Sequence, residues 1–330
     1  MVVRSGAPEG TRTHTLKARE PKSRMSTNSI TGACRIFDLI EYSTVFPLEQ
    51  EVFPRYNELV LFTHGNEGSI CPRPALLPFT TCFGRCSLTI ALPVLSAMGC
   101  QCCPLPTALL SAHTGFPGNT FLDLTAEMGR IADHWAAMDL QFDAIYSGFL
   151  GSADQVDTVA RFFDTFKKSG TAVIVDPVMG DHGTAYRTCT PELCRGMRVL
   201  AENSDVITPN LTEAALLLDR PYEEIQRTDA YEVVRRLSVG GRRSVVLTGY
   251  SSEPGQTGAL CFDRDSGESK AVQTPREPRD FSGTGDLFAS VLAGGVARGV
   301  PLFQAAQAAA DFVRDCIART LAEGLTEQDG

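Results

Sequence analysis

The stretch Phe281-Ser282-Gly283-Thr284-Gly285-Asp286 leads directly into the apolar run Leu287–Gly295. This pattern predicts a glycine-rich turn followed by a helix. Because glycine has no Cβ atom, the turn can direct consecutive backbone N–H groups at one point, beside the positive end of the helix dipole. Such a turn can bind an anion.

Asp286 falls in the first turn of the predicted helix. A carboxylate in this place can take a proton from an attacking hydroxyl, while the N–H groups of Gly283, Thr284 and Gly285 stabilise a phosphoryl group in transfer. A capped helix with no chemical function is the alternative for this stretch taken alone.

Short apolar runs alternate with helical patterns from about Phe83 to the end of the chain. Strands are expected over Gln101–Leu105, Ala144–Ser147, Ala172–Val175, Val206–Thr208, Ser244–Leu247 and Gly258–Phe262. Helices are expected over Ser87–Met98, Ala153–Lys168, Pro191–Ala201, Asn210–Leu218, Asp229–Leu237 and Pro301–Leu321. Nearly uniformly apolar strands that alternate with helices predict an α/β fold with a doubly wound, mostly parallel sheet and helices on both faces.

Polar residues directly follow several of these strands. Asp176, Thr208 and the pair Thr248-Gly249 each come at the end of a strand. In an open parallel sheet, ligands bind beyond the carboxyl ends of the strands, so these residues and the turn at Gly283–Asp286 form the expected ligand site.

Two further features suggest ligand contacts. Asn210 and Glu213 would project together from the start of a helix, where they could hold hydrated Mg²⁺ or a phosphate-bound water. A helix-capping pair is the alternative. The segment Thr107–Gly118, which contains His113, predicts a polar and aromatic loop of the kind that covers a ligand.

Composition and charge exclude several classes of function. The chain has 330 residues, 43% of them hydrophobic, and a formal net charge of −9, without a Lys/Arg stripe beyond the N-terminal tail. Nucleic acid is therefore not an expected partner. No apolar run is long enough to cross a bilayer and no signal peptide is recognisable, which favours a cytoplasmic protein that binds small molecules. The sequence has no P-loop motif, so a P-loop nucleotide site is not expected. It also lacks a dinucleotide-binding fingerprint, so hydride transfer is disfavoured.

Residues 1–77 differ from the rest of the chain. This segment is basic and polar at its start, shows little periodic apolar pattern, and is expected to be poorly ordered apart from a short strand over Asn57–Thr63. The predicted organisation is an atypical N-terminal segment, 1–77, followed by one α/β domain, 78–330.

The order and spacing of six segments resemble the ribokinase-like kinases, and within them the bacterial pyridoxal kinases. The segments are Phe83-Gly84-Arg85-Cys86-Ser87-Leu88-Thr89, Cys103-Pro104-Leu105-Pro106-Thr107, Tyr146-Ser147-Gly148-Phe149-Leu150-Gly151, Asp176-Pro177-Val178-Met179-Gly180-Asp181-His182-Gly183, Ile207-Thr208-Pro209-Asn210-Leu211-Thr212-Glu213-Ala214 and Gly283-Thr284-Gly285-Asp286. The resemblance covers about three quarters of the chain. It implies a ribokinase-like fold, a homodimer, and MgATP-dependent phosphorylation of the 5′-hydroxymethyl group of pyridoxal, pyridoxine or pyridoxamine.

The resemblance also assigns roles to residues of this chain. Asp286 would be the general base beside the anion hole of Gly283, Thr284 and Gly285. The metal would be held by Asp176 and Glu213, ATP and its phosphates by Asp176, Asn210, Glu213, Thr248 and Gly249, and the vitamin by Ser111, His113, Thr114 and Tyr146. Two departures from the family pattern, Ala112 in place of Asn and Phe116 in place of Tyr, bear on substrate preference.

The largest departure lies just before Phe83. Family members carry Ile-His-Asp-Leu-Ser-Gly or a similar run there, after a first strand, whereas this chain reads Pro78-Phe79-Thr80-Thr81-Cys82. Codons for these five residues, read two nucleotides later, can encode Ile-His-Asp-Leu and the start of Ser, so we hypothesise a frameshift at this point. The sheet is then expected to lack its first strand unless Asn57–Thr63 replaces it. A hydroxymethylpyrimidine kinase and an inactive kinase remnant that only binds ligand are the alternative functions.

Overall fold

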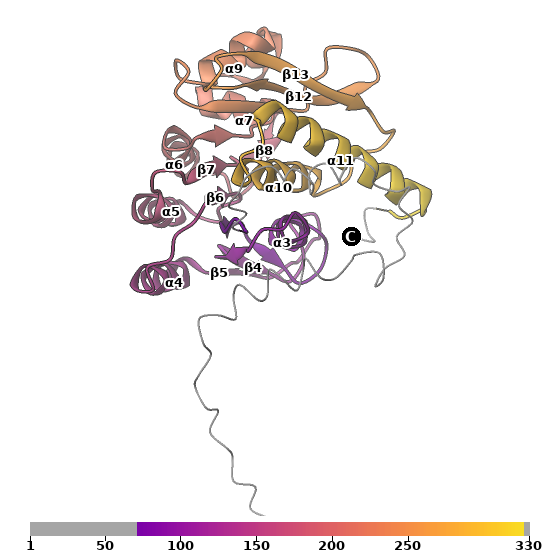
Figure 1. Ribbon diagram of the computed structural model, residues 1–330. Coiled ribbons are helices and arrows are strands. Elements are labelled where there is room, and N and C mark those ends of the chain that lie inside the picture. The colour runs from indigo at the N-terminus through magenta and orange to yellow at the C-terminus, as the bar shows by residue number, and fades with distance from the viewer. Residues whose placement is uncertain (1–70, 327–330) are drawn as a thin grey trace, which may run out of the picture. The chain divides into compact units, whose positions relative to one another are not determined.

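The computed structural model describes residues 71–326 (Figure 1). Within this range the main sheet has eight strands in the order β13-β12-β11-β10-β7-β6-β1-β3. The strands are β1 (Pro74–Leu77), β3 (Cys103–Pro104), β6 (Ala144–Ser147), β7 (Ala172–Val175), β10 (Val206–Ile207), β11 (Ser244–Thr248), β12 (Gln256–Phe262) and β13 (Ser269–Pro275). Neighbours from β3 to β11 pair in parallel, and β12 and β13 extend the sheet antiparallel.

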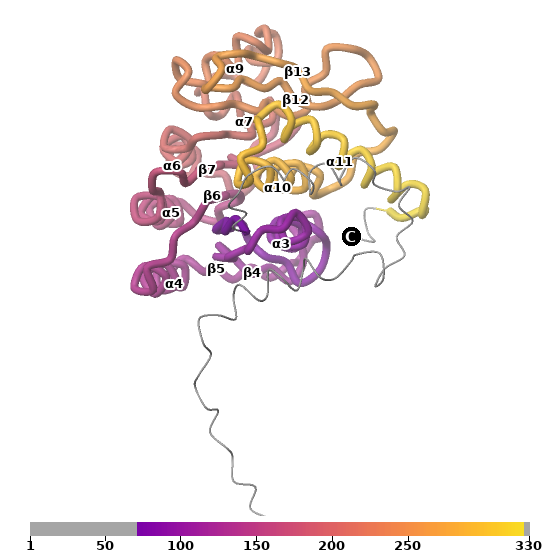
Figure 2. The backbone as a smooth tube through the Cα atoms, viewed as in Figure 1, coloured from indigo at the N-terminus to yellow at the C-terminus, as the bar shows by residue number. Residues whose placement is uncertain are grey.

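Helices cover both faces of this sheet (Figures 1 and 2). One face carries α3 (Leu88–Ala97), α10 (Thr284–Ala297) and α11 (Leu302–Ala322). The other carries α4 (Thr125–Ala137), α5 (Ala153–Phe166), α6 (Pro191–Glu202), α7 (Leu211–Leu218), α8 (Tyr222–Arg227) and α9 (Ala230–Leu237). The predicted doubly wound, mostly parallel α/β fold is therefore confirmed.

Successive side chains of each strand enter different cores. In β6, Ile145 packs under the face that carries α5, whereas Ala144 and Tyr146 pack under the face that carries α10. The period of two along a strand has this consequence when both faces are covered, and it explains why β1 and β7 are apolar at every position.

Strand β1 corrects the expectation that the sheet lacks its first strand. Pro74–Leu77 pairs in parallel with β6, residue for residue, from Pro74 opposite Ala144 to Leu77 opposite Ser147, and on its other side with β3. All four residues of β1 are buried. Proline is accommodated because it is the first residue of the strand. The sheet thus begins at Pro74, before the domain boundary that was expected after residue 77. The strand expected as a replacement, Asn57–Thr63, lies outside the described residues.

A small second sheet lies after β1. It is formed by β2 (Thr80–Thr81), β4 (Ala108–Leu110) and β5 (Phe121–Asp123), with β2 parallel and β5 antiparallel to β4. The expected loop at Thr107–Gly118 therefore begins with a strand. Phe79 packs edge-on against Phe149, with ring centroids 4.9 Å apart, so the atypical run at Pro78–Cys82 is part of the folded domain.

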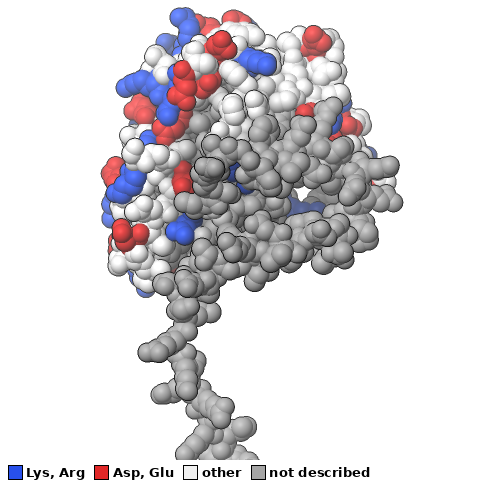
Figure 3. All heavy atoms as spheres, in the orientation of Figure 1, with Lys and Arg blue, Asp and Glu red and all other residues white. Residues whose placement is uncertain are grey.

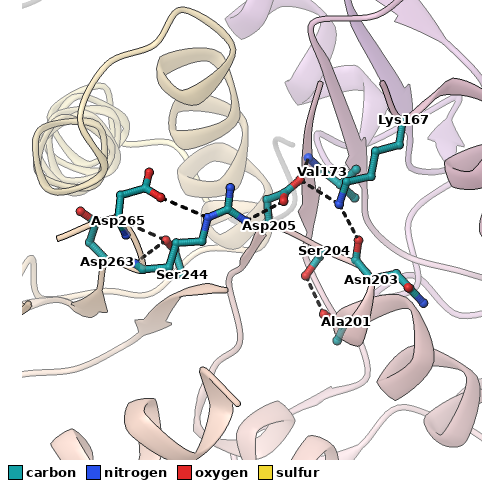
Figure 4. A network of polar contacts seen from close by, with 10 residues as sticks. Lys167, Val173, Ala201, Asn203, Ser204, Asp205, Ser244, Asp263 and Asp265 are labelled. Carbon is teal, nitrogen blue, oxygen red and sulfur yellow. Dashed lines mark hydrogen bonds and ion pairs between the residues drawn. The ribbon is translucent and has the colours of Figure 1, made fainter. Parts of the chain in front are cut away.

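A polar network joins the amino ends of three strands (Figure 4). Asp205, just before β10, accepts hydrogen bonds from the Val173 N–H at 2.8 Å and from Arg264 Nη1 at 2.6 Å. Its carboxylate also lies 3.2 Å from Lys167 Nζ. Because this network is at the end of the sheet opposite the strand termini that carry the predicted ligand site, its role is to hold the strands in place.

The described surface carries charges of both signs. In Figure 3, Lys and Arg side chains lie among Asp and Glu side chains over the described part of this face. Some charged side chains of the described residues form ion pairs within one helix, such as Arg195 with Glu192 at 2.8 Å. Among residues 71–326, no helix combines the length and the apolar character that a membrane span requires.

Candidate active site

The predicted glycine-rich turn is the start of α10. Gly283 is the residue before the helix and has φ 82° and ψ −3°, a left-handed conformation that glycine adopts without strain. A Cβ atom on Gly283 would lie 2.6 Å from the Arg85 carbonyl oxygen. At Gly285 a Cβ atom would meet none of the described atoms within 4 Å, apart from those of its chain neighbours. Among residues 71–326, no side-chain cap is present at this end of α10, which leaves its first-turn N–H groups available to an anion.

Asp286 projects from this first turn and is partly buried. Burial raises the pKa of its carboxyl group to about 6, although a hydrogen bond from the Ser87 backbone lowers it. A carboxylate with a pKa just below neutrality is mostly deprotonated at pH 7 and still basic enough to accept a proton.

Asp176 lies close to Asp286 although the two come from distant parts of the chain. Asp176 follows β7, and its Oδ1 accepts a 2.8 Å hydrogen bond from the hydroxyl of Thr208, which follows the neighbouring strand β10. Burial raises the pKa of Asp176 to about 7, the Thr208 hydrogen bond lowers it, and the charge of Asp286 raises it. The end of β7 and the first turn of α10 thus bring two acids near one another.

Asn210 and Glu213 form a capping box at the start of α7. The Asn210 side chain accepts from the Glu213 N–H, and the Glu213 carboxylate accepts from the Asn210 N–H, both at 2.9 Å. The other Glu213 oxygen accepts from the Met179 N–H at 3.1 Å, and Asn210 Nδ2 donates to the Gly180 carbonyl at 2.8 Å. The capping alternative is therefore what the structure shows. The pair fastens the loop at 176–183 to α7.

The fit to Mg²⁺ follows from these contacts. Within residues 71–326, no group of three or more His, Cys, Asp or Glu side chains has the arrangement of a metal site. Each oxygen of Glu213 accepts one backbone N–H, whereas among the described residues only Oδ1 of Asp176 accepts a hydrogen bond, so Asp176 is the less engaged of the two acids. Mg²⁺ in proteins is often held by one or two carboxylates together with waters and substrate phosphates. A site with the Asp176 carboxylate as its protein ligand fits this coordination.

Thr248 and Gly249 lie at the same edge of the sheet. The Thr248 N–H donates to the Pro209 carbonyl at 2.9 Å, which joins the end of β11 to the segment before α7. Gly249 has φ 72°, and none of the described atoms beyond its chain neighbours lies within 4 Å of where its Cβ atom would be. This open, left-handed position leaves room for a ligand beside the backbone.

The predicted substrate loop packs against the turn before α3. His113 stacks edge-on against Phe116 at 4.6 Å, and its ring occupies the space that a Cβ atom on Gly84 would need. Ser111 Oγ accepts from the Thr120 N–H at 2.8 Å, and Thr114 is exposed. The loop and Asp286 thus contact two ends of one short segment, 84–87.

Tyr146 is not at the surface of the site. Only 1% of it is exposed, and it packs in the core beneath α10. Burial, with the negative charges of Asp176 and Asp286, raises the pKa of Tyr146 well above its ordinary value, although hydrogen bonding to Ser290 lowers it. The buried side chain offers little surface to a ligand in this structure, and the substrate contact expected for Tyr146 stays a prediction.

Sequence analysis missed two serines at the site. Ser87 contacts Asp286 through its backbone and has φ 54°, which the sequence does not indicate. Ser290 could have been found, since it is the one polar residue in the run Leu287–Gly295 and follows Asp286 by one helical turn.

Comparison with known proteins identifies relatives over most of the chain. The phosphomethylpyrimidine kinase family matches residues 92–328. A pyridoxine/pyridoxal/pyridoxamine kinase from Bordetella avium (strain 197N) is 31% identical over 249 residues, 72% of this chain and 82% of the relative. A hydroxymethylpyrimidine/phosphomethylpyrimidine kinase from Bacillus subtilis (strain 168) is 31% identical over 202 residues, 61% of this chain and 73% of the relative.

Solved structures share the fold. A phosphomethylpyrimidine kinase candidate from Bacteroides thetaiotaomicron VPI-5482, crystallised with pyridoxal, has a TM-score of 0.72 and 39% identity, over 79% of this chain and 92% of that one. A pyridoxal kinase from Leishmania donovani, in complex with ADP and pyridoxamine, has a TM-score of 0.68 and 25% identity, over 78% of this chain and 91% of that one. The expected ribokinase-like fold is confirmed.

Proposed function

The chain belongs to the phosphomethylpyrimidine kinase family, and on that premise we propose that it phosphorylates the 5′-hydroxymethyl group of pyridoxal, pyridoxine or pyridoxamine with ATP as donor. The observation that carries the proposal is the position of Asp286. Its carboxyl group, with a pKa raised to about 6, stands in the first turn of α10 beside uncapped N–H groups. A base and an anion site at one helix start are the two elements that phosphoryl transfer to an alcohol needs.

Each part of the site has a proposed role. Asp286 takes the proton of the attacking hydroxyl group, and the N–H groups of Gly283, Thr284 and Gly285 stabilise charge on the phosphoryl group. Asn210, Thr248 and Gly249 contact ATP. Ser111, His113 and Thr114 cover the vitamin. Mg²⁺ would neutralise phosphate charge, with Asp176 as its protein ligand and Glu213 acting through the loop that it fastens.

The vitamin is favoured as substrate because of the solved relatives. Pyridoxal is bound in the Bacteroides structure, and ADP with pyridoxamine in the Leishmania structure. The second candidate is a hydroxymethylpyrimidine kinase, which the name of the family and the Bacillus relative favour. Both substrates present a hydroxymethyl group on a nitrogen heterocycle, so Asp286 could serve either reaction.

One assay separates these functions. Purified protein with MgATP and equimolar pyridoxal and hydroxymethylpyrimidine is expected to form pyridoxal phosphate faster than the phosphorylated pyrimidine, as measured by mass spectrometry. The reverse order would establish the second candidate. Binding of both ligands without any product would indicate the inactive remnant. A homodimer and a cytoplasmic location stay predictions, and native mass spectrometry tests the first.

A further inference from the structure

We propose that Gly84 is a positioning residue for the kinase reaction, because the space left by its missing side chain holds the ring of His113. The inference rests on the proposed function, in which His113 covers the vitamin. It gives a role to part of the segment Phe83–Thr89, which carries the resemblance to the family but to which no function has been assigned.

The His113 ring lies between two glycines. A Cβ atom on Gly84 would lie 2.2 Å from Cδ2 of the ring, and one on Gly115 would lie 2.8 Å from Cε1. Carbon atoms that are not bonded to each other pack best at about 3.5–4.0 Å, so an alanine at either position would displace the ring. Phe116 packs edge-on against the same ring, with centroids 4.6 Å apart. Three residues therefore set the position of the ring.

One nitrogen of the ring is bonded to the loop itself. The Gly115 N–H donates to His113 Nδ1 at 3.1 Å. A neutral imidazole has one donor and one acceptor nitrogen, so this bond places the proton of the neutral ring on Nε2. Among residues 71–326, no group accepts a hydrogen bond from Nε2. The ring thus keeps one N–H group with which to bind a polar atom of the vitamin.

Gly84 is held in place by the surrounding segment. It has φ 81°, in the left-handed region that glycine adopts without strain. Its carbonyl oxygen accepts a 2.9 Å hydrogen bond from Thr81 Oγ1. Two residues further along, the Cys86 N–H donates to Thr89 Oγ1 at 3.1 Å. The ring of His113 thus packs against a fixed stretch of backbone.

The next residue of this backbone contacts the anion-binding turn. The Arg85 carbonyl oxygen lies 2.6 Å from where a Cβ atom on Gly283 would be. The peptide group between Gly84 and Arg85 therefore links the ring proposed to cover the vitamin with the turn proposed to bind the phosphoryl group. A ring fixed to this peptide group keeps the vitamin in register with the phosphoryl group, and transfer is sensitive to displacements of about 1 Å.

The test compares Gly84→Ala with wild-type protein in steady-state assays with pyridoxal and ATP. The alanine is expected to raise KM for pyridoxal about tenfold, as the loss of one hydrogen bond to the substrate would, while KM for ATP stays within about twofold. In a His113→Ala background the same alanine has no ring to displace, so it should change KM by no more than about twofold.

Gly170→Ala is the control for backbone strain. Gly170 has φ 93°, and none of the described atoms beyond its chain neighbours lies within 4 Å of where its Cβ atom would be. An alanine there has an unfavourable φ, as at Gly84, but displaces no ring. KM for pyridoxal should therefore stay at the wild-type value in Gly170→Ala, and a rise equal to that in Gly84→Ala would show that strain alone is the cause.

Nitrogen NMR of the His113 ring supplies a readout that does not need catalysis, with His113→Gln to assign the signals. These signals are expected to shift in Gly84→Ala and to stay in place in Gly170→Ala. Wild-type KM for pyridoxal with unshifted signals in Gly84→Ala would overturn the inference. If that variant does not fold, Gly115→Ala replaces it, because its Cβ atom would meet the same ring without a positive φ. A wild-type KM in Gly115→Ala would then overturn the inference.

Failure of the proposed function gives a different result. Wild-type protein would then lack kinase activity, while the ring signals would still shift in Gly84→Ala. That outcome would refute the proposed function and support the placement of the His113 ring by Gly84.

Discussion

The backbone of Ser87, at the start of α3, lies near enough to the carboxylate of Asp286, in the first turn of α10, for hydrogen bonding to lower the pKa of that carboxyl group against the effect of burial. Ser87 and Asp286 are almost 200 residues apart in the chain, but α3 and α10 lie on the same face of the sheet. This proximity brings one backbone donor to the proposed base.

The two glycines of the turn are expected to respond differently to substitution. Gly283→Ala forces a left-handed residue to carry a Cβ atom 2.6 Å from the Arg85 carbonyl oxygen. Its free energy of unfolding should fall by about 1–3 kcal/mol. In Gly285→Ala the new Cβ atom meets no atom of the described part of the chain within 4 Å beyond its neighbours, so its stability should be unchanged, while kcat falls by about 10²–10³-fold because phosphate can no longer approach. Urea unfolding and steady-state kinetics measure both effects. Equal stability in the two variants, or normal kcat in Gly285→Ala, would contradict this account of the turn.

Asp176 should make stability depend on pH. Burial raises its pKa in the folded protein to about 7, against the Thr208 hydrogen bond that lowers it. The folded protein therefore holds a proton that the unfolded chain has released, and the stabilisation that this proton provides is lost as the pH rises through about 7. Asp176→Asn, which does not ionise, is expected to raise the melting temperature more at pH 8 than at pH 5 in metal-free buffer. An equal shift at both pH values would show that the buried charge is not the cause.

Asp205 should have the opposite pH dependence. Burial raises its pKa, but the hydrogen bonds from the Val173 N–H and Arg264, together with the charge of Lys167, lower it below the ordinary value overall. The stabilisation that ionised Asp205 provides is present at pH values above the pKa of this group in the unfolded chain. It is lost as the pH falls through the lower pKa that the group has in the folded protein. Asp205→Asn should reduce the free energy of unfolding by about 1–3 kcal/mol at pH 7 and by less at pH 3. The control is Asp157→Asn, since Asp157 is exposed on α5 and lies outside the network; if the two variants lose equal stability, the network has no special role.

The segment Pro78–Cys82 tests the frameshift hypothesis. In the structure this segment is folded, with Phe79 against Phe149 and the Thr81 hydroxyl bonded to the Gly84 carbonyl at 2.9 Å. Replacing it with Ile-His-Asp-Leu-Ser-Gly is expected to raise kcat for pyridoxal, because a His-Asp pair supplies polar groups beside the substrate that two threonines lack. A replacement with the His and Asp exchanged for Ala controls for the change in length. Equal kcat in the chain as given and in the replaced variant would remove the functional content of the hypothesis.

Some of this architecture could be predicted from sequence and some could not. Ala144–Ser147 and Ala172–Val175 were predictable because they are short, almost entirely apolar runs bounded by polar or glycine residues. Strand β1 was not, because Pro74–Leu77 is short, begins with proline and owes its conformation to partners about 30 and 70 residues further along.

The site shows the same division. The helix start at Gly283–Asp286 was predictable from glycine spacing and an apolar run. The burial of Tyr146 was not, since alternation along β6 defines two faces of the strand without saying which one α10 covers. Local sequence also gives no sign that Ser87 adopts a left-handed φ, because that conformation is imposed by neighbouring elements.

The most direct test of the central claim, that Asp286 is the base of a kinase reaction, is the kcat of Asp286→Asn in the pyridoxal assay. Asparagine keeps the size of the side chain but cannot accept the proton. We expect kcat to fall by about 10²–10⁴-fold, with the Kd for ATP nearly unchanged. An Asp286→Asn protein that phosphorylates pyridoxal at the wild-type rate would contradict the account.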